Sequence, residues 1–188
     1  MPRPKEFDRD EALDASIGVF REHGFAGTSA GMLTDAMKIG RQSLYDTFGD
    51  KWRLYCAAVQ RYAVAEAQAH FAALKTGPKA MDGICRMMER VVAEARMPCL
   101  GVSSISEFGD SRKDLAQLRN AAGRALRAAI ADKVRQAQAE GDAAVKLDPG
   151  HAAGFLIANV AAIRLAARAG AGDAELRALG RLAITALR

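Results

Sequence analysis

Apolar side chains recur along most of this chain at intervals of three and four residues, the spacing that gathers them on one face of an α-helix. Near the N-terminus, Leu13, Ile17 and Phe20 follow this spacing, and Gly24 comes where a helix would end. No segment shows the strict alternation of apolar and polar residues that is typical of a half-buried β-strand. The pattern therefore predicts an all-α protein.

Turn and capping residues divide the helical pattern into about nine segments. Gly77-Pro78 interrupts it, and Asp148 followed by Pro149 is typical of a helix start. The three N-terminal helices lie close together, which predicts a first domain over residues 1–50 and a second over 51–188. The predicted helices cover residues 8–23, 29–37, 40–47, 50–75, 79–96, a shorter stretch ending at 108, 111–140, 149–169 and 174–187.

The short predicted helix at residues 40–47 has two unlike faces. Its apolar residues are spaced to bury one side, whereas Arg41, Gln42 and Tyr45 give the other side more hydrogen-bonding groups than solubility requires. Three small helices with a tight turn between the second and third form the layout of a helix-turn-helix module, whose third helix enters the major groove of DNA. An ordinary solvated helix with a few polar residues is the alternative.

The residue types in this region match the hydrogen-bonding groups of DNA. Arg41 can make two hydrogen bonds to guanine, and Gln42 can do the same with adenine. The free backbone N–H groups at the start of the second helix suit a phosphate, and Lys51 is placed to bind a phosphate on the other flank. The predicted DNA-binding residues are Thr28, Ser29, Arg41, Gln42, Ser43, Tyr45, Thr47 and Lys51.

The overall charge adds little to this prediction. The chain carries a formal net charge of +5, but residues 1–61 contain nine Lys/Arg and nine Asp/Glu. The whole surplus therefore lies downstream, and only the local placement of cations points to nucleic acid. Arg3 and Lys5, ahead of the first helix, are placed to reach the DNA backbone or minor groove.

Composition narrows the remaining classes of protein. Half of the 188 residues are hydrophobic, which is ample for a packed core. No apolar run approaches the roughly 18 residues that span a bilayer, and the N-terminus lacks the hydrophobic stretch of a signal peptide. Cys56, Cys85 and Cys99 show no metal-ligand spacing, so we expect reduced thiols, a cytoplasmic location, and no metal or cofactor. Dispersed histidines and the lack of a glycine-rich phosphate loop argue against an enzyme.

Residues 24–59, GFAGTSAGMLTDAMKIGRQSLYDTFGDKWRLYCAAV, resemble the N-terminal signature of the TetR/AcrR family of bacterial transcription regulators. In that signature a G-[FY]-x-x-[TS]-[ST] entry precedes the second helix, and a recognition helix ending in L-Y-x-x-F is followed by G-x-K-x-x-L. The resemblance implies nine helices, a variable ligand-binding region and a dimer interface formed by the last two helices. The matching residues are Gly24, Phe25, Thr28, Ser29, Leu44, Tyr45, Phe48, Gly49, Lys51 and Leu54.

Two positions depart from the family pattern. Family members often carry serine where Gly40 stands, so this chain lacks a capping hydroxyl there. Asp46 stands where a basic or aromatic residue is frequent, and a carboxylate near phosphates is unfavourable. Asp46 either points away from DNA or accepts a hydrogen bond from a cytosine amine. The operator sequence therefore does not follow from the resemblance.

The last two predicted helices carry apolar stripes that suit a homodimer interface. Small residues would let helices of two subunits approach closely in a four-helix bundle. Packing of both stripes inside one subunit is the alternative, since core and interface stripes share one periodicity. The stripes consist of Gly154, Ala158, Ala161 and Leu165, followed by Leu176, Leu179, Ala183 and Leu187.

The middle helices carry apolar residues suited to a pocket for a hydrophobic effector. Methionine adapts to irregular apolar shapes, and plain core packing is the alternative at each position. The stretch PCLGVSS resembles the start of the sixth helix in relatives that sense electrophiles or oxidants through a thiol, here Cys99; an inert buried cysteine is the alternative. The predicted lining residues are Phe71, Met87, Met88, Val91, Cys99, Phe108 and Leu118.

Together these features predict a dimeric, ligand-responsive DNA-binding repressor that leaves a palindromic operator when a small hydrophobic effector binds. Three alternatives stay open: an activator or sequence-tolerant DNA organiser, a thiol-based sensor acting through Cys99, and a small-molecule binder or enzyme with a vestigial DNA module.

Overall fold

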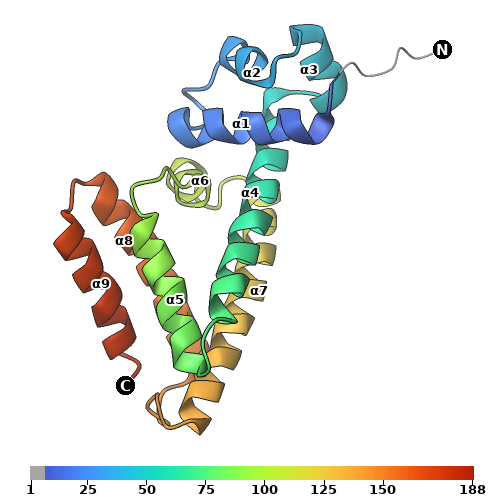
Figure 1. The fold of residues 1–188 in the computed structure, drawn as a ribbon. Coiled ribbons are helices and arrows are strands. Elements are labelled where there is room, and N and C mark those ends of the chain that lie inside the picture. Colours follow the sequence, from blue (N-terminus) through green and yellow to red (C-terminus); the bar gives the residue numbers. More distant parts are fainter. Residues whose placement is uncertain (1–6) are drawn as a thin grey trace. The chain divides into compact units, whose positions relative to one another are not determined.

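The computed structural model describes residues 7–188 and builds them from α-helices without a β-strand (Figure 1). The predicted all-α fold is confirmed, and each predicted helix is present. Arg3 and Lys5, which the sequence places near DNA, lie outside the described residues. The helices are α1 (Arg9–His23), α2 (Ala30–Met37), α3 (Arg41–Phe48), α4 (Lys51–Leu74), α5 (Ala80–Ala93), α6 (Leu100–Phe108), α7 (Lys113–Ala139), α8 (Pro149–Arg168) and α9 (Asp173–Thr185).

Local chemistry sets several helix ends. Asp8 caps α1 by accepting hydrogen bonds from the backbone N–H groups of Asp10 at 2.7 Å and Glu11 at 3.0 Å. Asp148 caps α8 in the same way, accepting from His151 N at 2.7 Å. These caps satisfy backbone donors that have no partner inside the helix, which is why the sequence located both helix starts correctly.

α8 is long and apolar enough, by length and composition, to cross a membrane, and it is the one such helix among residues 7–188. This differs from the expectation from sequence, because isolated polar residues such as Asn159 and Arg164 break the apolar run without lowering its average hydropathy enough. The core helix of a soluble protein passes the same test. The Arg164 guanidinium is buried and lies 2.8 Å from a carboxylate oxygen of Glu66.

The described chain forms two compact units. Unit 1 comprises the residues up to 64 together with 98–119, and unit 2 comprises 65–97 together with 120–188. α4 and α7 each contribute residues to both units. The boundaries of the compact units differ from the predicted domain boundary at residue 50, because the start of α4 and all of α6 pack with α1–α3. The functional boundary at residue 50 stays a prediction.

The interior of unit 1 is apolar and rich in aromatic rings. Phe20 of α1 and Leu44 of α3 are buried in a common core. The ring of Phe25 packs edge-on against Trp52 of α4 and Phe108 of α6, with ring centroids 5.3 Å and 5.6 Å apart. Each such pair contributes about 0.5–1.5 kcal/mol beyond the burial of its area. The aromatic rings therefore fix the turn that contains Phe25 to α4 and α6.

The core of unit 2 lies among α5, α8, α9 and the parts of α4 and α7 that belong to this unit. Leu176, Ala183 and Leu187 are buried in it. The prediction that these three residues line a dimer interface is therefore wrong, because they pack inside one subunit. Ala158 and Leu165, from the predicted stripe on α8, are exposed.

Candidate nucleic-acid interface

The turn between α1 and α2 depends on two glycines. Gly24 adopts φ 67°, ψ −175°, a backbone conformation that residues other than glycine rarely take. A Cβ on Gly27 would lie 2.4 Å from the carbonyl oxygen of His23. The hydroxyl of Thr28 donates to the carbonyl oxygen of Gly24 at 2.6 Å and closes the turn. The G-F-A-G-T-S sequence thus has a structural reason at Gly24, Gly27 and Thr28, three of its six positions.

The two predicted phosphate-binding hydroxyls have different environments. Thr28 is only 2% exposed, and its hydroxyl is engaged by Gly24. Ser29 is exposed and caps α2, accepting from Met32 N at 3.2 Å. Thr28 therefore positions the start of α2, whereas Ser29 and the first N–H groups of α2 remain at the surface for an anion.

A short turn fixes α3 relative to α2. α2 ends at Lys38, which adopts the left-handed conformation with φ 54° and ψ 41°. Ile39 donates its backbone N–H to the carbonyl oxygen of Thr34 at 3.2 Å. Gly40 occupies the N-cap of α3 without a side-chain cap, as its missing hydroxyl predicts.

α3 has one exposed polar face and one buried apolar face. Leu44 and Phe48 are buried in the core of unit 1, while Arg41 and Tyr45 are exposed. Ser43 and Thr47 are partly buried beside that face. All the predicted base-contacting side chains therefore lie along one accessible side of an eight-residue helix.

The exposed face of α3 contains one contact that the sequence analysis did not anticipate. The side-chain amide of Gln42 donates to a carboxylate oxygen of Asp46 at 2.9 Å, one helical turn away. This bond fixes the direction of the Gln42 amide and leaves its oxygen and one N–H for a base edge, which is the pair of groups that adenine requires. In the described structure Asp46 is engaged by Gln42, a third possibility beside the two expected.

Lys51, at the start of α4, lies beside the α1–α2 turn. Its ammonium nitrogen is 4.4 Å from the ring centroid of Phe25, a cation–π geometry. Gly49 precedes it with φ 83°, and Asp50 accepts from Arg53 N at 2.8 Å to start the helix. Lys51 is therefore held near the flank of α3 by an aromatic face rather than by a carboxylate.

α6 also holds this turn, through Glu107. The two carboxylate oxygens of Glu107 accept from the backbone N–H groups of Phe25 at 2.9 Å and Ala26 at 2.7 Å. More than 80 residues separate these partners, so neither periodicity nor spacing signals the contact. Glu107 connects the helix-turn-helix directly to α6.

Trp52 makes a second long-range contact within unit 1, between α4 and α7. Its indole N–H donates to Asp114 at 2.7 Å, and the guanidinium carbon of Arg112 lies 3.6 Å from a ring centroid of the indole. The hydrogen bond from Trp52 lowers the pKa of Asp114, so this carboxylate is ionised at neutral pH. The start of α7 is thereby fastened to the start of α4.

The predicted effector-lining residues divide between the two units. Met87, Met88 and Val91 are buried in the core of unit 2, and Phe71 is half-buried in the same unit. Cys99, Phe108 and Leu118 belong to unit 1 and are half-buried. The three buried residues of α5 pack in the manner of an ordinary core, and their role in effector binding stays a prediction.

Unit 2 contains a charged cluster in its interior. Glu66 of α4 accepts from Arg90 of α5 at 2.9 Å and from Arg164 of α8 at 2.8 Å. Burial opposes ionisation of Glu66, but Arg164 and Arg90 outweigh it, so its pKa is lowered. The ring nitrogen Nδ1 of His70 lies 3.3 Å from a guanidinium nitrogen of Arg90. Burial, reinforced by the charge of Arg90, lowers the pKa of His70 to about 4. His70 is therefore neutral at physiological pH.

Across residues 7–188, no group of three or more His, Cys, Asp or Glu side chains is placed to hold a metal ion.

Comparison with known proteins gives one family. The family model described as "Bacterial regulatory proteins, tetR family" matches residues 12–58, which run from α1 into α4. The chain is 28% identical to the HTH-type transcriptional repressor ComR of Escherichia coli (strain K12), over 99% of this chain and 90% of ComR. It is 48% identical to YezE, an uncharacterized HTH-type transcriptional regulator of Bacillus subtilis (strain 168), over 33% of this chain and 32% of YezE.

A solved structure extends the similarity to the whole fold. A cysteine mutant of the TetR family transcriptional regulator CifR, complexed with 26-bp double-strand operator DNA, superposes with a TM-score of 0.83 at 26% identity. The similarity covers 99% of this chain and 100% of the CifR chain. The matched proteins are named as regulators and repressors of transcription, not as enzymes.

Proposed function

Because the chain belongs to the TetR family of DNA-binding transcriptional regulators, we propose that it is a repressor that a small hydrophobic effector releases from a palindromic operator. The exposed face of α3 is the observation that carries this proposal. Arg41, Gln42 and Tyr45 lie there on a helix whose other side is buried and whose preceding turn is fixed. We place the protein in the cytoplasm, where its operator and its three free cysteines belong.

Within this proposal the polar residues have distinct roles. Arg41 and Gln42 read base edges in the major groove, and the Gln42–Asp46 bond pre-orients the amide. Ser29, with the N-terminal N–H groups of α2, binds a phosphate on one flank, and Lys51 binds one on the other. Base contacts determine sequence preference, whereas the phosphate contacts contribute a salt-dependent affinity that is similar for all sequences.

We propose a homodimer formed through α8 and α9. Phe155 and Leu165 on α8 are 43% and 49% exposed, and Leu182 on α9 is 64% exposed. Exposed large apolar side chains on two neighbouring helices are typical of an interface that another subunit covers. In this arrangement α9 contributes Leu182 in place of the buried Leu176 and Ala183. Two subunits would present two copies of α3 about one duplex turn apart.

Effector release follows from the course of α4. Residues 51–64 of this helix belong to unit 1, and residues 65–74 belong to unit 2. An effector that binds among the predicted lining residues of unit 2 would displace the part of α4 in that unit and so change the separation of the two recognition helices. Glu107 offers a second route, because α6 holds the α1–α2 turn. A coupling of about 1–3 kcal/mol is typical of such regulation.

Selection of bound sequences from random duplexes tests the proposal most directly. A selected site with two inverted half-sites, and a dimer in sedimentation, are expected.

The substitution Leu165→Glu should convert the dimer to a monomer and weaken operator binding. Ala174→Glu, at an exposed position near the start of α9, serves as the matched control. In vitro transcription from the selected site then separates repression from activation. Extended protection without symmetry would instead favour a DNA organiser.

A thiol sensor is the second candidate, because Cys99 is the N-cap residue of α6 and is half-buried. A group added to its sulfur would disturb the start of the helix that carries Glu107. Treatment with N-ethylmaleimide should then release operator from the wild type but not from Cys99→Ser. Equal release from both would exclude Cys99 as the sensor.

A further inference from the structure

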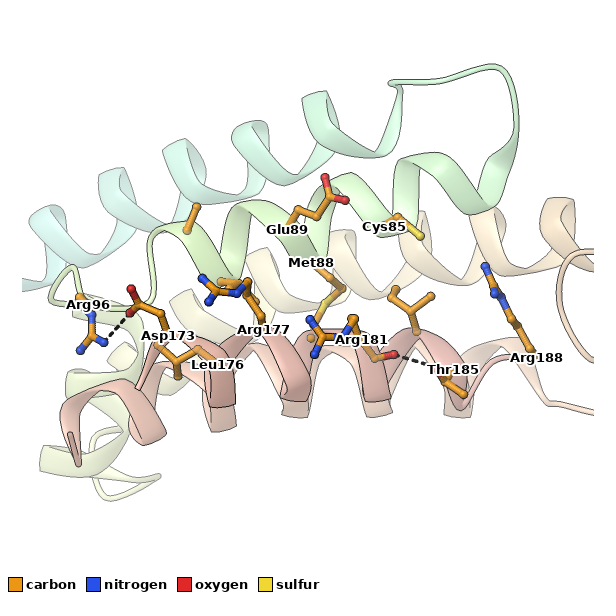
Figure 2. A pocket seen from close by; sticks show the side chains of 14 residues that line it. Cys85, Met88, Glu89, Arg96, Asp173, Leu176, Arg177, Arg181, Thr185 and Arg188 are labelled. Carbon is orange, nitrogen blue, oxygen red and sulfur yellow. Dashed lines mark hydrogen bonds and ion pairs between the residues drawn. The ribbon is translucent and has the colours of Figure 1, made fainter. Parts of the chain in front are cut away.

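A groove of about 850 Å³ runs between α5 and α9 in unit 2 (Figure 2). Its volume lies within the range of small-molecule sites. It overlaps the predicted effector-lining set at Met88 alone. The apolar part of its lining is formed by Met88, Val92, Leu176, Gly180 and Ile184.

The bottom of the groove is closed by direct helix packing. A Cβ on Gly180 would lie 2.8 Å from a methyl carbon of Val92, so α9 approaches α5 closely at this point. The side chains of Met88 and Leu176 are each only 2% exposed. The groove therefore has a fixed apolar floor formed by the two helices.

The rim of the groove carries three arginines whose guanidinium groups are in no close ion pair within residues 7–188. Arg177 and Arg181 on α9, and Arg188 just beyond the end of that helix, line the side of the groove (Figure 2). Among the described residues, no hydrogen bond or ion pair engages the side chain of any of the three. Guanidinium groups with free N–H donors beside an apolar surface are suited to a partly buried carboxylate, sulfonate or phosphate.

The carboxylates of the rim are already paired. Asp173 lies 2.6 Å from the guanidinium of Arg96, and Glu89 lies 2.9 Å from that of Arg86. Neither acid makes a direct contact with any of these three arginines, and Arg177 acts on Asp173 only at a distance. The groove combines an apolar floor with an excess of positive charge.

We propose that this groove binds an amphipathic organic anion, whose apolar chain or ring lies on the floor and whose acidic head group is held by Arg177 and Arg181, with Arg188 nearby. Burial of the apolar portion supplies affinity, and the arginines select the charge of the head group. The site is distinct from the DNA-binding face of α3, and it stands independently of the repressor mechanism proposed above.

Cys85 provides a local reporter of occupancy. It lines the groove and is half-buried. Burial raises the pKa of its thiol, so alkylation by iodoacetamide is slow and easily followed at mildly alkaline pH. Cys56 and Cys99 belong to unit 1, and peptide mass spectrometry measures all three thiols in one sample.

The test uses dodecanoate as the probe and dodecylamine as a cationic control of equal chain length, both below micellar concentrations. We expect saturating dodecanoate to slow alkylation of Cys85 at least fivefold without changing that of Cys56 or Cys99, and dodecylamine to have no effect. The double variant Arg177→Gln/Arg181→Gln should raise the dissociation constant for dodecanoate at least tenfold. Arg124→Gln, which removes an exposed arginine of α7, should bind it as the wild type does.

Three results would overturn the proposal. Unprotected Cys85 means that the groove is not a site for this class of ligand, and equal protection by dodecylamine means that apolar adhesion alone is responsible. Conversion of the double variant to a monomer in sedimentation assigns the arginines to a subunit interface. Operator binding is measured in parallel on the same variants, so a failure of the repressor proposal is recorded separately.

Discussion

The two compact units distribute polar and apolar groups in opposite ways. Unit 1 has an aromatic interior, and its polar residues Arg41 and Gln42 lie on the exposed face of α3. Unit 2 has the charged residues Glu66 and Arg164 in its interior and an exposed apolar residue, Leu165, on α8. An exposed polar face suits a hydrated, charged partner such as DNA, whereas an exposed apolar face suits another protein surface. Removing groups from each unit tests this contrast.

The largest effect is expected from Glu66→Ala in unit 2. The substitution leaves Arg90 and Arg164 without the carboxylate that lies between them, and loss of one partner from a buried ion pair costs about 3–5 kcal/mol. Urea denaturation measures the change in free energy of unfolding. The control Glu89→Ala removes an exposed pair with Arg86 and should cost less than about 1 kcal/mol. A loss below 1 kcal/mol for Glu66→Ala would mean that the cluster is solvated.

The pH dependence of unit 2 should depend on His70. Its pKa is about 4 in the folded protein and near 6.5 when unfolded, so between these values the unfolded chain binds a proton that the folded chain does not. Stability therefore falls as pH is lowered from about 6.5 toward 4, by up to about 3 kcal/mol. His70→Gln, which retains a hydrogen-bond acceptor for Arg90, should flatten this slope in denaturation series at each pH. An unchanged slope would assign the dependence to other groups.

In unit 1, two substitutions should separate sequence reading from general affinity. Arg41→Ala should weaken binding to the selected operator by about 1–3 kcal/mol and relax preference at one base pair. Lys51→Ala should weaken binding to all duplexes similarly and reduce the salt slope by about 1. Fluorescence anisotropy across salt concentrations measures both effects, with Arg124→Ala as a remote control. Wild-type behaviour of both variants would mean that the contacts are misassigned.

Glu107→Ala tests whether α6 holds the α1–α2 turn. Two backbone N–H groups lose a charged acceptor, which should destabilise unit 1 by about 1–2 kcal/mol and increase hydrogen exchange at Phe25 and Ala26. The control Asp110→Ala removes a neighbouring exposed carboxylate and should leave exchange at these amides unchanged. Equal exchange in both variants would show that the aromatic rings alone hold the turn.

The smallest effect is expected at Lys38, the one described residue other than glycine with positive φ. Lys38→Gly removes about 1 kcal/mol of left-handed strain, but it adds backbone entropy to the unfolded chain. The net gain in unfolding free energy should be a few tenths of a kcal/mol in urea denaturation. Lys38→Ala keeps the strain and should show no gain, and greater stability in that variant would mean that the strain is negligible.

The elements of the fold were predictable because their signals are local. Asp8 and Asp148 mark helix starts through hydrogen bonds to residues two or three positions away, and Gly24 marks a helix end by its own backbone conformation. The polar face of α3 was predictable for the same reason, since Leu44 and Phe48 define the buried side. Such features depend on residues within one or two helical turns.

The α9 stripe shows where local patterns become ambiguous. Leu176, Leu179, Ala183 and Leu187 share a periodicity that suits either a core or an interface, and burial of three of them assigns these to the core. The engagement of Gln42 with Asp46 was also within one helical turn, yet the sequence offered other partners for both side chains. In such cases the pattern limits the choices without selecting one.

By itself the sequence determined the order and approximate ends of the helices, the polar side of α3 and the resemblance of the N-terminal residues to the TetR family, because each depends on neighbours along the chain. The tertiary structure decided that Glu107 holds the α1–α2 turn, that Glu66 joins Arg90 to Arg164, and that α9 forms a groove with α5. These contacts join residues tens of positions apart, and the free energy that selects them arises only after the helices have packed.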